Sequence, residues 1–145
     1  MTEPKSINYI DIDLMEKMCH PLAVAIFDSK KEPIPSFAKH DREKLEAALH
    51  NPQYEYYPTF TKKASILYYG LAKGHCFENG NKRTATASLL VFLHINNFWL
   101  DGDKKEVEDY LVNLAQRLAA SEGNKEMSSF LEEVERWLDS HIRHS

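Results

Sequence analysis

Apolar residues recur along most of this chain at a spacing of three to four positions, which is typical of helices that bury one face. Only five glycines occur among the 145 residues, which is few for a sheet-rich fold with many tight turns. We therefore expect an all-α protein. No repeat, low-complexity segment or linker divides the chain, so residues 1–145 are expected to form a single domain.

The N-terminal part of the chain predicts two short helices and a long connection. Asp13 and Glu16 form a capping-box pattern ahead of an apolar stripe, and Pro21 should kink or divide that helix. Residues 28–40 contain two prolines in PxP spacing, which predicts an exposed, extended connection. Asp41 should then cap a short helix that Pro52 ends, and that helix has Leu45, Ala48 and Leu49 on one face.

Two helices are predicted in the middle of the chain. Thr59, after Pro58, should begin the first, and Gly74 stands where a left-handed C-terminal cap is expected. The second runs from Arg83 to about Asn96 and has small or apolar side chains on nearly all sides, so it should be buried at the centre of a helical bundle.

The C-terminal part predicts two more helices. Asp103 should cap the first, and Gly123 should end it. Ser129 and Glu132 form a capping-box pattern for the last helix, whose apolar residues are Phe130, Val134, Trp137 and Leu138.

Composition narrows the range of functions. The formal net charge is -4, and no basic excess of the kind that binds nucleic acid is present. The two cysteines show no zinc-ligand spacing, which favours a reducing compartment. No signal-peptide pattern and no apolar run long enough to span a membrane occurs. We expect a soluble, cytoplasmic protein that binds neither membrane nor nucleic acid directly.

Polar side chains gather where the two middle helices meet, in the stretch GHCFENGNKR. A helix N-terminus offers unpaired N–H groups and the positive end of the helix dipole, so it attracts anions. Gly80 allows a close approach of a ligand, and Asn81, Lys82 and Arg83 add an amide and two cations. Cations at this end oppose the dipole, which indicates a phosphate ligand. Pairing of both cations with acidic side chains elsewhere is the structural alternative.

His75 precedes this turn and is a candidate general base. A lone histidine is more often structural, and His94, inside the apolar helix, is interpreted only in that way. Phe77 stands between the polar residues and should anchor the loop in the core.

The stretch HCFENGNKRTA, residues 75–85, resembles the signature HxFxxxNKRTA of the Fic/Doc superfamily, and specifically that of its Doc (death-on-curing) toxins. The helical pattern from about Pro58 to Asn97 is similar as well. The resemblance implies a Fic-type helical bundle in which His75 is the catalytic base. It also implies that Asn81, Lys82 and Arg83 bind the phosphates of ATP.

Two positions distinguish this sequence from AMP-transferring Fic enzymes, which resemble it but have glycine at the place of Lys82 and a second arginine at that of Thr86. The resemblance to Doc implies phosphate transfer from ATP to a hydroxyl of a target protein, for which elongation factor Tu is the family's known example. AMP or other nucleotidyl transfer, and a non-catalytic module that binds a nucleotide or a protein, are the alternatives.

The resemblance also implies a magnesium ion and a protein partner. Family members often have a carboxylate that binds Mg²⁺ at the place of Asn79, whose amide oxygen would be an uncharged ligand. The autoinhibitory pattern [ST]xxxE[GN] of some Fic proteins is incomplete here, because Leu118 stands four residues before Glu122. A Doc-like protein is instead inhibited by a separate antitoxin, typically through a disordered segment that folds into a groove.

Overall fold

The computed structural model describes the chain except residues 1–3, 5, 28–29, 31, 121–126 and 145. It is 69% helix and 5% strand, which confirms the all-α expectation. The elements follow one another in the order α1 Ile12–Leu14, the π-turn η1 Met15–Cys19, α2 His20–Phe27, the 3-10 turn η2 Phe37–Lys39, α3 Arg42–His50, the 3-10 turn η3 Asn51–Gln53, α4 Phe60–Lys73, α5 Asn81–Ile95, β1 Phe98–Leu100, α6 Lys104–Ala120, α7 Met127–His141 and β2 Ile142–His144.

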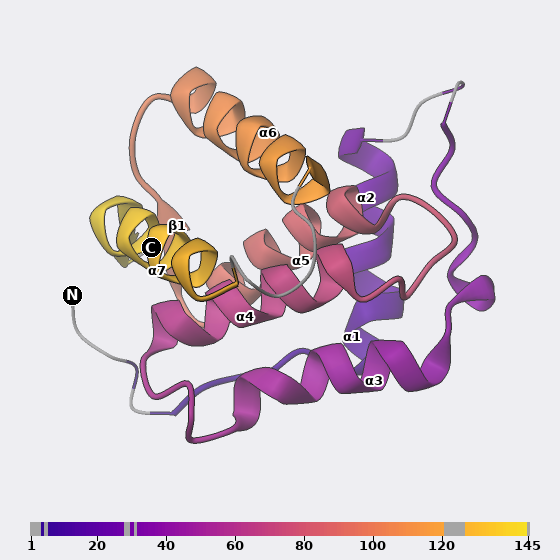
Figure 1. Cartoon of the computed structure of the whole chain (residues 1–145), viewed down its shortest axis with the longest axis horizontal. Coiled ribbons are helices and arrows are strands. Elements are labelled where there is room, and N and C mark those ends of the chain that lie inside the picture. The colour runs from indigo at the N-terminus through magenta and orange to yellow at the C-terminus, as the bar shows by residue number, and fades with distance from the viewer. Residues whose placement is uncertain (1–3, 5, 28–29, 31, 121–126, 145) are drawn as a thin grey trace.

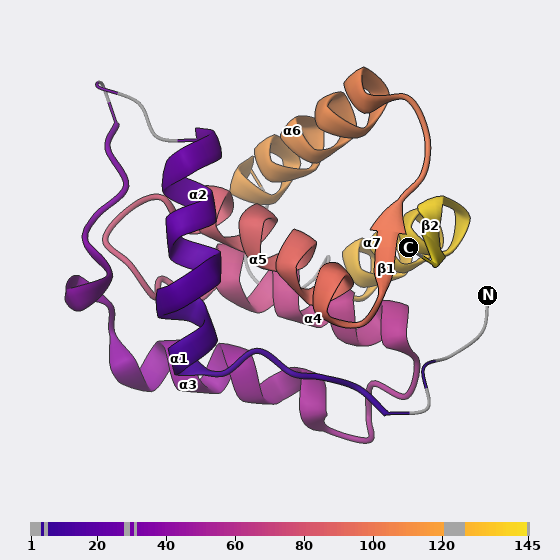
Figure 2. The ribbon, with the colours of Figure 1, turned by 180° about the vertical axis from the view of Figure 1, so that it is seen from behind.

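Helices α4 and α5 pack side by side at the centre of the bundle, as Figures 1 and 2 both show. Helix α3 and helix α7 cover α4, and α2 packs on α5. The residues of α5 at 84–89 and 91–93 are all buried. The prediction of a buried central helix is therefore confirmed, and its first turn is the end that the polar loop reaches.

The first helical run begins and bends differently from the prediction. Asp11, rather than Asp13, is the N-cap, and its Oδ1 accepts from the N–H of Leu14 at 2.8 Å. The run then widens into the π-turn, where the N–H of His20 bonds to Met15 O. Pro21 follows directly, so the wider hydrogen-bond spacing coincides with the place where proline lacks a donor. Helical structure thus continues through Pro21 to Phe27.

The caps of α3 and α4 agree with the sequence. Asp41 accepts from the N–H of Lys44 at 3.1 Å, and Thr59 Oγ1 accepts from the N–H of Lys62 at 3.1 Å. The expected left-handed cap at Gly74 is wrong, because Gly74 is right-handed, with φ -79°. His75 has the left-handed backbone instead, with φ 53°.

The connection between α2 and α3 is only partly exposed. Ile34 is buried and packs with Ala23 and Ala87, so the extended segment contributes to a small second core. The 3-10 turn η2 follows it and leads into α3.

The C-terminal elements differ from the prediction in two respects. Asp103 does cap α6, since its Oδ2 accepts from the N–H of Glu106 at 3.2 Å. The expected end at Gly123 lies outside the described residues. Helix α7 already includes Met127, so Ser129 and Glu132 lie within it and the predicted capping box there is wrong. Its predicted apolar residues face the core, with Val134 and Leu138 fully buried.

A two-stranded antiparallel sheet was not predicted. β1 pairs with β2 in the register Phe98 with His144 and Leu100 with Ile142. Each strand has three residues, too few to show an alternating pattern in the sequence. None of the helices within the described ranges is both long and apolar enough to cross a membrane.

Candidate active site

The loop between α4 and α5 is anchored in the core by its two middle residues. Cys76 and Phe77 are buried. The Phe77 ring lies among the rings of His20, Phe37 and His40, with centroid separations of 5.8 to 6.4 Å. The predicted anchoring role of Phe77 is confirmed. Burial, and secondarily the nearby Asp41 carboxylate, raises the pKa of the Cys76 thiol to about 11, so that thiol stays neutral near pH 7.

Asn81 fixes the shape of the loop through its side chain. Its Oδ1 accepts the Phe77 N–H at 3.0 Å, and its Nδ2 donates to Phe77 O at 2.9 Å. The amide therefore closes the chain between the buried ring and the first residue of α5. One N–H of Nδ2 remains in addition to this pair, because a primary amide has two donors.

Gly80 begins α5 with a backbone that favours glycine. It has φ 77° and ψ 10°, and no side chain caps the helix start. Its carbonyl accepts the N–H of Thr84 at 2.9 Å, which closes the first helical turn. The N–H groups of that first turn have no acceptor within the helix, so they can donate to an anion.

The two cations after Asn81 have different surroundings. Arg83 is half-buried, and its Nη1 donates to Glu32 O at 2.5 Å and more weakly to Phe27 O at 3.4 Å. Its Nη2 lies beside the helix start, since a Cβ added to Gly80 would be 3.4 Å from it. Among the described residues, no hydrogen bond or ion pair of the Lys82 side chain is found. Neither cation pairs with a carboxylate there, contrary to the structural alternative considered for this dipeptide.

A segment that the sequence analysis did not connect with the site lies against it. Ile34 is the side chain nearest to Gly80 after Arg83, at 3.5 Å from a Cβ placed there. His20 Nε2 donates to Pro35 O at 2.7 Å, and His40 Nδ1 donates to Phe37 O at 2.6 Å. Residues 32–37 thus contact the loop between α4 and α5 (residues 74–80, called the motif loop below) through Arg83, His20 and the ring cluster around Phe77. The PxP spacing was the sequence signal in this segment, but it predicted only an extended chain and not a contact with the site.

His75 lies on the same loop, directly after α4. It is exposed, has a left-handed backbone, and makes no hydrogen bond or ion pair with the described residues. Non-glycine residues adopt this conformation uncommonly, and such strain gathers at functional positions. The imidazole is therefore accessible to a substrate.

Asn79 and Glu78 are the oxygen-bearing side chains nearest in sequence to the helix start, and both are exposed. No group of three or more His, Cys, Asp or Glu side chains that could hold a metal is found in the part of the chain that the structure describes. A hard cation there would need most of its ligands from water and from phosphate oxygens.

The donor set at the start of α5 fits a nucleotide phosphate. Uncapped N–H groups, the Lys82 ammonium and the Nη2 edge of Arg83 are all donors, and Gly80 has no side chain to obstruct an approaching anion. For Mg²⁺ the fit is partial, because Asn79 and Glu78 offer oxygen atoms without a preformed cluster.

Comparison with known proteins covers the same region. A family model described as the Fic/DOC family matches residues 9–93, from before α1 almost to the end of α5. A protein named Toxin Doc, from Mycolicibacterium smegmatis, is 40% identical over 80 residues. That match covers 50% of this chain and 62% of the relative, so the chain spans less than two thirds of the relative's length. No solved structure matches.

Proposed function

The chain belongs to the Fic/DOC family, and from that premise we propose that it is a Doc-type toxin that transfers phosphate from ATP to a hydroxyl of a target protein. The observation that carries this proposal is the uncapped start of α5, with left-handed Gly80 and, on its first turn, a Lys82 side chain that makes no hydrogen bond or ion pair with the residues that the structure describes. Such an arrangement accepts a polyphosphate without rearranging its backbone.

The phosphates of ATP would bind the first turn of α5. The N–H groups of residues 81–83 donate to phosphate oxygens, and Lys82 adds a compact positive charge. Arg83 contributes its Nη2 edge while Nη1 stays on the carbonyls of Phe27 and Glu32. Asn81 keeps its bonds to Phe77 and offers its remaining N–H.

His75 would act as the general base. Its imidazole takes the proton from the target hydroxyl, whose oxygen then forms a bond to the γ-phosphorus. The bond between that phosphorus and the bridging oxygen breaks, and ADP leaves. Mg²⁺, with Asn79 as its proposed protein ligand, would neutralise charge on the phosphates.

Lys82 is the residue from which we infer phosphate rather than AMP transfer. A lysine side chain at this position of the first turn of α5 would fill space that a glycine would leave open. A lysine there contacts a terminal phosphate oxygen and opposes a pose in which the α-phosphate lies on the helix start. Thr86 is uncharged and therefore supplies no second cation; it is buried, and its hydroxyl donates to Lys82 O at 3.0 Å.

The partners that we propose follow from the same assignment. The relative's name describes it as a toxin. For this chain we propose inhibition by a separate antitoxin protein, and elongation factor Tu as the target, both in the cytoplasm. We propose that a disordered segment of the antitoxin folds into a groove of this chain on binding.

Intact-mass spectrometry of elongation factor Tu tests the proposed reaction. The purified target is incubated with the chain, ATP and Mg²⁺, and a mass gain of one phosphate group is expected. A gain of one AMP group would replace phosphate transfer by nucleotidyl transfer on the same site. No gain on elongation factor Tu, or on any protein of a bacterial extract labelled with γ-phosphate-labelled ATP, would contradict the proposal.

A further inference from the structure

The guanidinium of Arg83 bonds to the backbone on one edge and faces the start of α5 with the other. Its Nη1 donates to Glu32 O at 2.5 Å and more weakly to Phe27 O at 3.4 Å. Its Nη2 lies 3.4 Å from the place of a Cβ on Gly80, beside the first turn of α5. A guanidinium is planar and rigid, so an orientation that fixes one edge also fixes the other. Arg83 thus connects the helix start to a distant part of the chain.

The carbonyl groups that Arg83 contacts belong to the end of α2 and to the extended chain before η2. Phe27 is the last residue of α2, where carbonyls lack a partner within the helix and a cation is favourable. Glu32 begins residues 32–37, called the connecting segment below, which run towards η2 beside the motif loop in Figures 1 and 2. A side chain of α5 therefore fixes the place where the connecting segment begins.

Two further contacts hold the connecting segment against the helices. Ile34 is buried in the small second core between α2 and α5. His20 Nε2, from α2, donates to Pro35 O at 2.7 Å. The Ile34 side chain also lies 3.5 Å from the place of a Cβ on Gly80. The connecting segment is therefore one wall of the place where we propose that phosphate binds.

We propose that Arg83 is a positioning residue that couples phosphate binding at the start of α5 to the position of the connecting segment. An anion on the Nη2 edge restrains the guanidinium, which then holds the carbonyls of Phe27 and Glu32 more firmly on its Nη1 edge. Such coupling is reciprocal, so a firmly held segment raises the affinity for the anion. The inference rests on the proposed function, because it takes this anion to be the phosphates of ATP.

Hydrogen exchange of the amides of the connecting segment tests the coupling without group transfer. In the parent chain, saturating ATP should slow this exchange by about fivefold or more, the lower end of typical coupling between two sites. Inorganic triphosphate should act in the same way, because it has no base or sugar that could cover the segment. Arg83→Lys keeps a cation but not the planar fork, so exchange should be fast with or without ATP. Lys82→Ala keeps the fork, so saturating ATP should still slow exchange.

Three outcomes of the exchange experiment contradict the proposal. Equal exchange with and without ATP in a parent chain that binds ATP would make Arg83 a structural link only. Slowed exchange that persists in Arg83→Lys would show that ATP covers the connecting segment directly. A parent chain that binds neither ATP nor triphosphate would overturn the proposed function as well, whereas slowed exchange without phosphate transfer would contradict only the proposed reaction and would support the coupling.

ATP affinity, measured by calorimetry, tests the reciprocal effect. His20→Phe removes the bond to Pro35 O and keeps an aromatic ring beside Phe77. This change lies at the end of the connecting segment away from the Arg83 bonds. It should weaken ATP binding by about fivefold in the parent chain and leave it unchanged in the Arg83→Lys background, because two coupled residues do not act additively in a double-mutant cycle.

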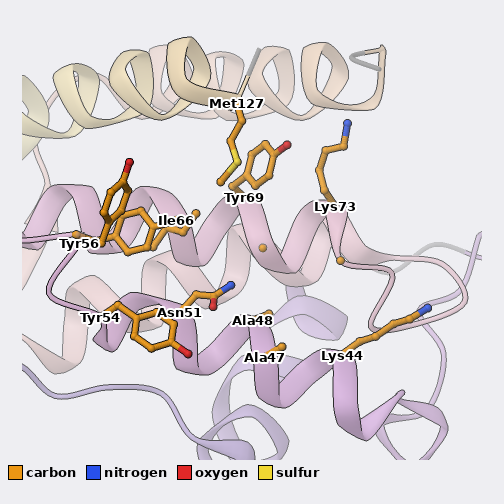
Figure 3. A pocket seen from close by; sticks show the side chains of 13 residues that line it. Lys44, Ala47, Ala48, Asn51, Tyr54, Tyr56, Ile66, Tyr69, Lys73 and Met127 are labelled. Atoms are coloured by element: carbon orange, nitrogen blue, oxygen red, sulfur yellow. The ribbon is translucent and has the colours of Figure 1, made fainter. Parts of the chain in front are cut away.

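Tyr56→Ala is the control for this measurement. Tyr56 is 83% exposed and lines a groove between α3 and α4, to which the described residues of the connecting segment contribute nothing (Figure 3). Its ATP affinity should equal that of the parent chain. Equal ATP affinities of His20→Phe and Tyr56→Ala, or an equal effect of His20→Phe in both backgrounds, would overturn the proposal.

Discussion

The side-chain amide of Asn81 bonds to both backbone groups of Phe77, accepting the N–H at 3.0 Å and donating to the carbonyl at 2.9 Å. One end of this link is the first residue of the central helix and the other is the buried ring that anchors the loop. A residue that we propose to bind phosphate therefore also fixes the shape of the loop at the proposed phosphate site.

Asn81→Ala removes both bonds, and we expect it to lower the free energy of unfolding by about 1–3 kcal/mol. ATP affinity should fall as well, because the loop loses its fixed shape. Urea unfolding and calorimetry on one preparation measure the two effects. Asn79→Ala is the matched control, since Asn79 is exposed and its change should stay within about 0.5 kcal/mol. Equal stability of the two variants would show that the Phe77 link contributes nothing.

His75→Asn should reduce phosphate transfer by about 10²–10⁴-fold without altering the fold. Asparagine is chosen because it tolerates the left-handed backbone that His75 adopts, with φ 53°, whereas alanine would add strain. Turnover and circular dichroism are compared with the parent. Parent-like turnover would leave His75 without a catalytic role.

Lys82→Ala should weaken ATP binding by roughly 1.5–3 kcal/mol, the value of a hydrogen bond to a charged group. Phosphate transfer should fall accordingly. Lys105→Ala, a lysine of α6 distant in sequence from the motif, controls for the lost net charge. An ATP affinity equal to that of the control would remove Lys82 from the phosphate site.

Asn79→Asp should tighten binding of magnesium-loaded ATP, because a carboxylate adds charge to a hard-cation site. Calorimetric titrations with and without Mg²⁺ separate this effect from direct repulsion of the phosphates. Unchanged affinity in the presence of Mg²⁺ would exclude Asn79 as a metal ligand.

Acid should weaken the packing of α6 on α7 through Glu133. Hydrogen bonding by Arg117 holds the pKa of this carboxyl below its ordinary value of 4.5, and Tyr110 also donates to it. A lowered pKa in the folded state means that the stabilisation is complete above the unfolded pKa and is lost as the pH falls through the folded pKa. Because the pair is partly exposed, the effect should be below about 1 kcal/mol.

Glu133→Gln tests this expectation. Its free energy of unfolding should be lower than that of the parent at pH 7, and the difference should shrink as the pH falls through the lowered folded-state pKa of Glu133, because the parent's carboxyl then becomes neutral as well. A difference that persists unchanged in acid would assign the effect to packing rather than to charge.

Local signals predicted most of the helices. Asp41, Thr59 and Asp103 cap α3, α4 and α6 because an N-cap bond joins residues three apart and needs no distant partner. The pattern at Ser129 and Glu132 failed because the same letters also occur inside an amphipathic helix, and α7 already begins at Met127, which packs against the core ahead of Ser129.

The composition of the motif loop was predictable, but the direction of its side chains was not. The burial of Phe77 follows from its apolar ring among polar neighbours. The bonds of Arg83 to Phe27 and Glu32 depend on a segment more than 50 residues away in sequence, and no periodicity encodes them. The left-handed backbone at His75 was missed for a related reason, since glycine at position 74 was the more obvious candidate for it.

The β1–β2 pair has a practical consequence for measurements in which the protein is attached to a surface. Pairing with Phe98 holds His144 close to the end of α5, whereas the motif loop precedes the first turn of that helix (Figure 2). The 15 residues of α5 separate these ends by about 22 Å. A biotin or an affinity handle grafted after His144 would therefore orient every immobilised molecule with the loop facing the flowing solution.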